Sequence, residues 1–145
     1  MSLEARLLLE RGAMRIDVSL SVQPGETVAL LGPNGAGKSS VLRSLAGLLP
    51  LTEGCIAVTR PDGEREVWDE PRTETFVPPE RRSVGVVFQD YVLFPNLSVL
   101  ENVGFGLRAR GTQADRTRAA ASAELERVGL SGFAQRLPAE LSGGQ

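Results

Sequence analysis

The feature that most constrains this chain is a glycine-rich loop at residues 32–40. The loop consists of Gly32, Pro33, Asn34, Gly35, Ala36, Gly37, Lys38, Ser39 and Ser40. It matches the pattern G-x-x-x-x-G-K-[ST], in which backbone N–H groups surround a triphosphate, the lysine reaches the outer phosphates and the hydroxyl binds Mg²⁺. The loop therefore predicts a phosphate-binding site.

The segments on either side of the loop fit the arrangement that this pattern requires. Residues 27–31 form a short apolar run that predicts a buried strand, and the turn at Pro24 and Gly25 precedes it. After the loop, apolar residues recur at helical spacing through residues 39–48. A strand, a glycine loop and a helix in this order place the unpaired N–H groups of a helix N-terminus against an anion.

Lys38 is the only lysine in the chain, because every other basic residue is arginine. A compact ammonium can lie between phosphate oxygens, whereas the planar guanidinium of arginine has a different shape and hydrogen-bonding geometry. This exception favours a phosphate-binding role for Lys38 over that of a solvent-exposed lysine at a helix start.

Composition and charge argue against several other classes of protein. The net charge is −2 and the arginines are scattered, with Arg81 and Arg82 as the densest pair, so we expect no nucleic-acid partner. Cys55 is the single cysteine and is expected to be a packed residue. Residues 1–11 do not resemble a signal peptide, and no apolar run approaches the ~20 residues of a membrane span. We expect a cytoplasmic soluble chain.

The first part of the chain predicts mainly strands. Residues 3–9 and 16–22 are expected to pair as antiparallel strands, and residues 55–59 and 65–68 to form a hairpin. The polar residues 69–80 are expected to form a surface loop.

The second part begins with a buried strand and continues with helices. Residues 84–88 predict the strand, which would end at Gln89. Ser98 and Glu101 form a capping box for a helix that is expected to fade near residues 104–106. A second helix is expected to be capped by Thr112 and to end before Gly129, which makes the chain an α/β protein.

With these motifs in this order, essentially all 145 residues resemble the nucleotide-binding subunit of an ABC transporter. The resemblance rests on loop 32–40, on the strand end Val87, Phe88 and Gln89, and on the terminal run Leu141, Ser142, Gly143, Gly144 and Gln145. It implies a P-loop NTPase core with an N-terminal antiparallel β subdomain and a helical subdomain. Residues 1–89 would hold the first subdomain and the core, and residues 90–145 the helical subdomain.

The resemblance also implies roles for individual residues. The nucleotide-binding set would be Gly32, Asn34, Gly35, Ala36, Gly37, Lys38, Ser39, Ser40 and Gln89. ATP would be held with Mg²⁺, for which Ser39 and Gln89 would be the ligands, and Gln89 would also orient the attacking water.

Two partners follow from the same resemblance. The loop at residues 90–95, from Asp90 to Pro95, would contact a transmembrane permease subunit, although burial of Phe94 in the chain's own core is an alternative. Leu141, Ser142, Gly143, Gly144 and Gln145 would face the ATP of a second subunit in a head-to-tail dimer. The chain would then be peripheral to the cytoplasmic side of the membrane.

Within the family, residues 77–111 resemble importer ATPases for oxyanions, iron or sugars, and residues 10–22 most resemble the molybdate type. The expected function is therefore coupling of ATP binding and hydrolysis to uptake of molybdate or a similar oxyanion, with iron, sulfate or sugar as alternatives. A non-catalytic nucleotide-binding module is a further alternative. An ATPase of DNA repair is disfavoured, because the spacing between the motifs is compact.

Three departures from the family pattern bear on activity. No aromatic residue precedes Trp68 to stack on adenine, so adenine affinity would rest on aliphatic contacts near residues 11–14 or on no specific contact. The acidic strand that follows the terminal motif in relatives would lie beyond Gln145, and the chain has no histidine for the family's switch position. The resemblance therefore implies a truncated ATPase with an incomplete central sheet, no assignable catalytic residue and no turnover of its own.

Overall fold

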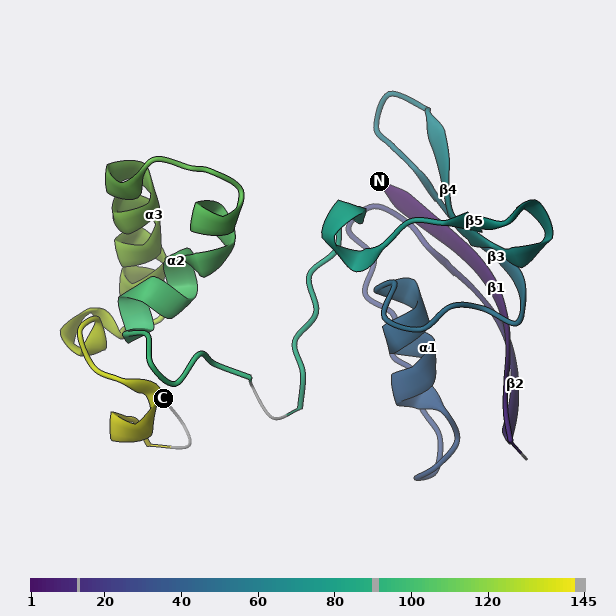
Figure 1. Ribbon diagram of the computed structural model, residues 1–145, viewed down its shortest axis with the longest axis horizontal. Coiled ribbons are helices and arrows are strands. Elements are labelled where there is room, and N and C mark those ends of the chain that lie inside the picture. The colour runs from purple at the N-terminus through teal and green to yellow at the C-terminus, as the bar shows by residue number, and fades with distance from the viewer. Residues whose placement is uncertain (13, 90–91, 143–145) are drawn as a thin grey trace. The chain divides into compact units, whose positions relative to one another are not determined.

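The computed structural model describes residues 1–12, 14–89 and 92–142 and divides into two compact units, residues 1–86 and 87–145 (Figure 1). The first unit contains a five-stranded sheet with the order β2-β1-β3-β4-β5 and helix α1. The second contains helices α2 and α3. The bounds in the first unit are β1 Ser2–Arg11, β2 Met14–Val22, α1 Lys38–Leu45, β3 Glu53–Thr59, β4 Arg65–Glu70 and β5 Thr75–Phe76.

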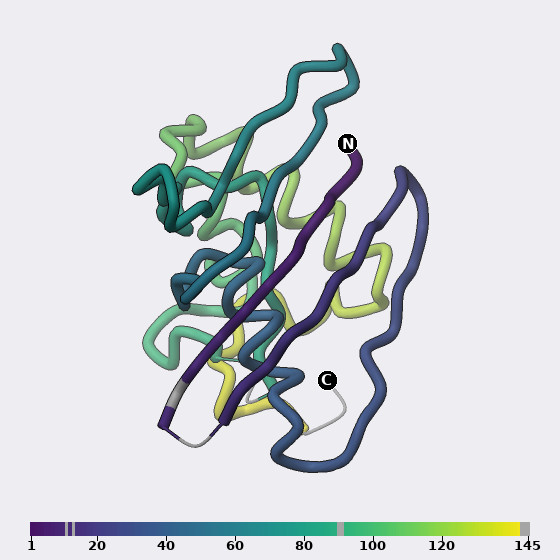
Figure 2. The backbone as a smooth tube through the Cα atoms, turned by 90° about the vertical axis from the view of Figure 1, so that its right-hand side faces the viewer, coloured from purple at the N-terminus to yellow at the C-terminus, as the bar shows by residue number. Residues whose placement is uncertain are grey.

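The sheet is antiparallel throughout, as expected for the N-terminal strands. Strands β1 and β2 form a long hairpin and lie side by side from the pair Leu3 and Val22 to the pair Arg11 and Met14 (Figure 2). Strand β3 pairs with the other edge of β1 and continues into the predicted hairpin with β4. Alternating side chains of these strands point to one face, which helix α1 covers (Figure 1).

The core of the first unit lies between this face and α1. Leu7 of β1 and Ile56 of β3 are fully buried, and Val41 of α1 and Trp68 of β4 join the same cluster. Full burial of such a side chain stabilises a fold by about 1.5–3 kcal/mol. This packing holds the helix that follows the glycine-rich loop against the sheet.

Strand β4 contains a one-residue bulge that the sequence pattern did not predict. Asp69 pairs with Ile56, but the next pair joins Val67 with Ala57, so Trp68 is an extra residue on β4. The bulge interrupts the alternation of the strand, and both Trp68 and Asp69 are buried. The prediction of a surface loop over residues 69–80 is therefore wrong in part. Residues 71–80 are exposed or half-buried, but the stretch begins with the end of β4, contains strand β5 and the 3₁₀ helix Pro71–Thr73, and leads into the 3₁₀ helix Pro79–Arg81.

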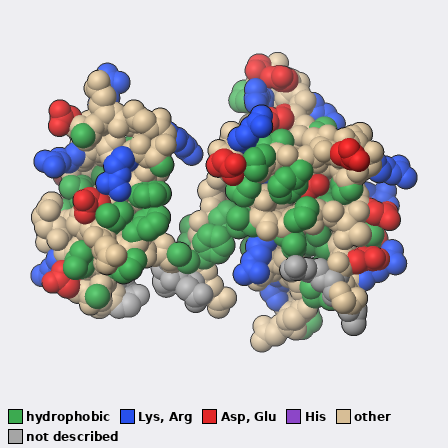
Figure 3. All heavy atoms as spheres, in the orientation of Figure 1, with side chains coloured by type: hydrophobic (Ala, Val, Ile, Leu, Met, Phe, Trp, Pro, Cys, Tyr) green, Lys and Arg blue, Asp and Glu red, His purple; other side chains and the backbone are tan. Residues whose placement is uncertain are grey.

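Two further strand predictions, at residues 27–31 and 84–88, are also wrong. Neither segment is a strand, although Leu30 packs against the core. Leu31 is 91% exposed and Val87 is 88% exposed, and hydrophobic side chains are visible on the surface of both units (Figure 3). An extended segment needs a neighbouring strand for its backbone hydrogen bonds. Within the described residues, neither segment has one.

The second unit is built on α2 (Val99–Ala109) and α3 (Ala114–Arg127), which pack against each other. The predicted capping box is confirmed: Glu101 N–H donates to Ser98 Oγ at 3.3 Å, and Ser98 N–H donates to the Glu101 carboxylate at 2.8 Å. Helix α2 does not fade near residues 104–106. Gly104 lies inside it, where an added Cβ would be 2.8 Å from Thr117 Cγ2 of α3.

The ends of the other helices differ slightly from the predictions. Gln113, not Thr112, precedes the first residue of α3. Helix α1 ends at Leu45, three residues before the predicted limit of 48. In the part of the chain that the structure describes, no helix has both the length and the apolar character needed to cross a membrane.

Candidate nucleotide-binding site

Loop 32–40 joins a segment without regular structure to the N-terminus of α1. The chain turns at residues 34–37, where Ala36 N–H donates to Pro33 O at 3.3 Å. Gly35 has φ 81° and Gly37 has φ 88°, which is the left-handed region that other residues adopt at a cost of roughly 1–2 kcal/mol. The glycines therefore allow a tight turn directly in front of a helix.

Gly37 has a second reason to lack a side chain. It is the N-cap of α1, and an added Cβ would overlap Ile16 Cδ1 and lie 2.7 Å from Ile16 Cγ1. Ile16 comes from β2 and is buried in the core. Ile16 of the core thus lies directly against Gly37 of loop 32–40, a contact that sequence reasoning did not predict.

The start of α1 is an uncapped helix N-terminus. No side chain caps it and no acidic residue lies in its first turn. The first N–H groups of an α-helix have no partner inside the helix, and the helix dipole adds partial positive charge there. Such an end can bind an anion through its backbone.

Lys38 completes this positive end. Its Nζ donates to Gly32 O at 2.8 Å and to Pro33 O at 2.7 Å, so the side chain runs back across the loop that precedes it. An ammonium has three protons to donate, and two of them point to loop carbonyls. The structure thus places a cation, a tight glycine turn and an uncapped helix N-terminus together.

The remaining residues of the loop lie at its surface. Asn34 and Ser39 are exposed, and Ser40 is half-buried. No group of three or more His, Cys, Asp or Glu side chains that could hold a metal ion occurs in residues 1–12, 14–89 and 92–142. The Ser39 hydroxyl is accessible for a metal ion that takes most of its ligands from a nucleotide and water, as Mg²⁺ does.

The other predicted site residues belong to the second unit. Gln89 is exposed in a turn and does not end a strand. Leu141 is half-buried at a bend and Ser142 is exposed. Asp90, Tyr91, Gly143, Gly144 and Gln145 lie outside the described residues.

Phe94, in the predicted permease loop, packs against α2 and is 45% exposed. Its ring lies 4.2 Å from that of Phe105, centroid to centroid. Asn102 joins the two segments, because its side chain accepts from Phe94 N–H at 2.8 Å and donates to Leu97 O at 2.9 Å. The ring is therefore packed within its own unit while 45% of it stays exposed, and contact of this loop with a permease stays a prediction.

Arg82 and Asp69 form a buried charged pair that sequence reasoning missed. Arg82 Nη2 and Asp69 Oδ2 are 4.0 Å apart, and the two side chains are 0% and 3% exposed. Burial lowers the pKa of Arg82 and raises the pKa of Asp69. The negative charge of Asp69 opposes the shift at Arg82, and the positive charge of Arg82 opposes the shift at Asp69. The arginine lies beneath α1, the helix of the loop.

Comparison with known proteins identifies the family of the chain. The family model described as "ABC transporter" matches residues 16–145. The chain is 46% identical over 129 residues to an Fe(3+) ions import ATP-binding protein of Rhizobium meliloti, covering 89% of this chain and 33% of that protein. It is 47% identical over 128 residues to a spermidine/putrescine import ATP-binding protein of Frankia alni, covering 88% of this chain and 25% of that protein.

A second spermidine/putrescine import ATP-binding protein, from Roseobacter denitrificans, is 48% identical over 128 residues, covering 88% of this chain and 32% of that protein. The chain thus spans from 25% to 33% of the length of these relatives. Because the matched region covers most of the chain and includes the whole of loop 32–40, the chain belongs to the ABC transporter family.

Proposed function

We propose that this chain binds Mg-ATP in loop 32–40 and is the ATP-binding part of an ABC importer subunit. The observation that carries the proposal is the position of Lys38, whose ammonium lies 2.8 Å from Gly32 O and 2.7 Å from Pro33 O, beside the uncapped start of α1. Phosphate oxygens are stronger acceptors for an ammonium than neutral carbonyls. The phosphates of bound ATP would therefore replace the Gly32 and Pro33 carbonyls as acceptors for the Lys38 ammonium.

Mg²⁺ fits the donor groups that the loop offers. One hydroxyl, from Ser39, together with phosphate oxygens and water is a common ligand set for this ion, which keeps several waters. Gln89 is proposed as a further ligand on the basis of the sequence motif. The ion would supply charge neutralisation at the β- and γ-phosphates.

Titration calorimetry with Mg-ATP tests nucleotide binding. We expect Lys38→Ala to raise the Kd at least 100-fold, and Lys38→Arg to weaken binding as well, because a planar guanidinium does not replace a compact ammonium. Arg43→Ala is the matched control, since this exposed basic residue lies in the last turn of the same helix. Equal affinity of the unaltered chain and Lys38→Ala would contradict the proposal.

Hydrolysis is proposed for a head-to-tail pair of subunits, in which Leu141, Ser142, Gly143, Gly144 and Gln145 of one chain face the ATP of the other. The alternative is a nucleotide-binding module that pairs with a complete subunit without turning ATP over itself. Turnover and sedimentation measured with and without Mg-ATP separate these possibilities. We expect binding without turnover from these 145 residues alone, since they contain no histidine for the family's switch position, and we expect hydrolysis from a longer version of the subunit that carries this position.

The transported solute is proposed from the relatives. Their names refer to import of Fe(3+) or of spermidine and putrescine. These names support Fe(3+), one of the alternatives left open above, in place of molybdate. The proposed partner is a permease subunit that meets residues 90–95 at the cytoplasmic face of the membrane.

Co-purification with the membrane subunits of an Fe(3+) importer tests the partner. We expect Phe94→Ala to weaken this association and Phe133→Ala, elsewhere in the second unit, to leave it unchanged. Loss of association in both variants, or in neither, would argue against residues 90–95 as the contact.

A further inference from the structure

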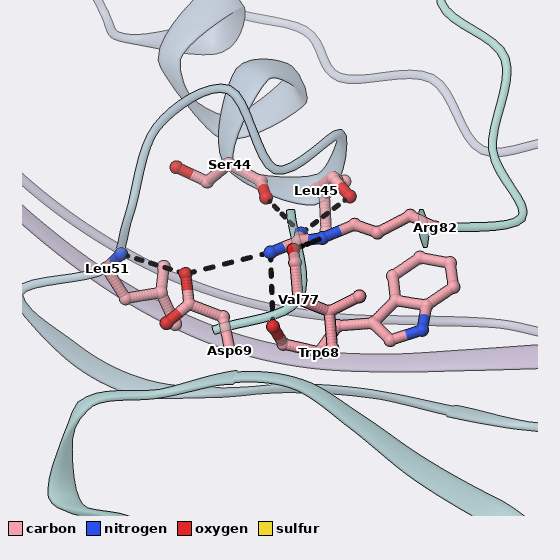
Figure 4. A network of polar contacts seen from close by, with 7 residues as sticks. All are labelled: Ser44, Leu45, Leu51, Trp68, Asp69, Val77 and Arg82. Atoms are coloured by element: carbon pink, nitrogen blue, oxygen red, sulfur yellow. Dashed lines mark hydrogen bonds and ion pairs between the residues drawn. The ribbon is translucent and has the colours of Figure 1, made fainter. Parts of the chain in front are cut away.

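Arg82 is a buried cation at the C-terminal end of helix α1 (Figure 4). Its Nη1 donates to Ser44 O at 2.7 Å and to Leu45 O at 3.0 Å, which are carbonyls of the last helical turn. Carbonyls at a helix end have no partner within the helix, and a cation there complements the helix dipole. Arg82 therefore holds the end of α1 that is opposite the glycine-rich loop.

The same guanidinium also holds two other segments. Nη2 donates to Trp68 O of β4 at 3.2 Å, and Nε donates to Val77 O at 2.7 Å. Asp69 adds an ion pair, and its carboxylate also accepts from Leu51 N–H, which follows α1, at 3.1 Å. All three nitrogens of the guanidinium thus donate to backbone carbonyls, and together they join α1, β4 and residue 77 at one buried point.

Helix α1 connects this buried point to the nucleotide site. It is eight residues long, which corresponds to about 12 Å at 1.5 Å per residue. A helix of this length behaves as a short rod, so a tilt at its C-terminal end changes the direction of the N–H groups at its N-terminal end. Gln89 follows Arg82 by seven residues in the sequence, so the segment that leads to Gln89 also begins at this point.

We propose that Arg82 is a positioning residue for nucleotide binding. It sets the orientation of α1 against β4, and thereby the direction in which loop 32–40 and Lys38 face the phosphates. This inference rests on the proposed function, because it assigns to Arg82 an effect on the same site without contact with the nucleotide.

The first test compares Arg82→Met and Arg82→Lys with Val58→Ala. Val58 is a buried β3 residue of the same core and is not a hydrogen-bond partner of Arg82. At a temperature where circular dichroism shows each variant folded, we expect Arg82→Met to raise the Kd for Mg-ATP at least tenfold. Arg82→Lys should have an intermediate effect and Val58→Ala less than a twofold effect. Equal weakening by Val58→Ala would mean general destabilisation and would overturn the proposal.

Gly47→Ala is a second test, which also applies if Arg82→Met does not fold. The substitution displaces the Arg82 side chain without removing it. A Cβ at residue 47 would lie 2.7 Å from Arg82 Nε and 3.0 Å from Cζ. Gly63→Ala is the matched control, because φ is 87° at Gly63 and 78° at Gly47, while nothing lies within 4 Å of a Cβ at residue 63. We expect at least tenfold weaker Mg-ATP binding in Gly47→Ala alone, and equal affinities of the two variants would contradict the proposal.

Amide hydrogen exchange of residues 38–45 without nucleotide separates the inference from the proposed function. We expect faster exchange in the Arg82 and Gly47 variants than in their controls. If the unaltered chain binds no Mg-ATP, the proposed function fails, while faster exchange still supports the anchoring of α1 by Arg82. If the chain binds Mg-ATP and these variants bind it equally well, only the positioning role fails.

Discussion

Replacing Gly37 by alanine tests how the core shapes the glycine-rich loop 32–40. The left-handed φ of 88° at this position costs a non-glycine residue roughly 1–2 kcal/mol. The added methyl would also overlap the buried Ile16 side chain, and overpacking of a core costs about 1–3 kcal/mol. We expect Gly37→Ala to lower the free energy of unfolding of the first unit by about 2–5 kcal/mol, the sum of these two effects.

Gly35→Ala is the matched control for the backbone effect alone. Gly35 has φ 81°, close to that of Gly37, but nothing lies within 4 Å of a Cβ placed there. The expected loss is therefore roughly 1–2 kcal/mol. The difference between the two variants measures the contact with Ile16.

Ile16→Ala provides the rescue, because it removes the two atoms that a methyl at residue 37 would meet and leaves Cβ 3.9 Å away. The single variant is itself destabilising by about 2–5 kcal/mol, since Ile16 is buried. We expect the free energy of unfolding of the double variant to fall by about 1–3 kcal/mol less than the sum of the losses in the two single variants.

Urea unfolding followed by Trp68 fluorescence measures these values. Trp68 is the single tryptophan and lies buried in the core of the first unit. Equal losses in Gly37→Ala and Gly35→Ala, or additive losses in the double variant, would refute the role assigned to Ile16.

Three further predictions concern the second unit and are measured by amide exchange of α2. Hydrogen bonds from the Ser98 side chain and backbone lower the pKa of Glu101. Above the unfolded pKa of about 4.3, the ionised Glu101 therefore stabilises the folded unit, and this stability is lost as the pH falls through the folded pKa. Glu101→Gln should flatten this dependence of stability on pH. Gly104→Ala should cost about 1–3 kcal/mol, with partial rescue by Thr117→Ser, which removes Cγ2. Asn102→Ala should cost about 1–3 kcal/mol, because the Phe94 and Leu97 backbone groups lose their partner.

Local patterns predicted those parts of the fold that depend on neighbouring residues in the sequence. The β1–β2 and β3–β4 hairpins follow from alternation and turn residues. The capping box at Ser98 and Glu101 forms because its two residues lie within one helical turn. The glycine-rich loop likewise forms a tight turn before a helix, as its motif predicts.

The incorrect predictions concern features that depend on distant partners. Residues 27–31 and 84–88 have the composition of strands, but a strand also needs a paired neighbour, which local composition cannot provide. The bulge at Trp68 buries Asp69, although an aspartate in a polar stretch predicts an exposed loop. In the sequence Arg82 is one member of a basic pair typical of a solvated surface, whereas the structure buries its side chain completely.

The sequence by itself determined the residues from which a phosphate site is predicted, because that motif places glycines, a lysine and a hydroxyl at fixed spacing within nine residues. Only the tertiary structure decided what holds that loop in place. Ile16 reaches Gly37 from β2, and Arg82 reaches the far end of α1 from a segment 37 residues beyond Leu45. Such contacts depend on how the sheet and the helix pack, and no local spacing of residues encodes them.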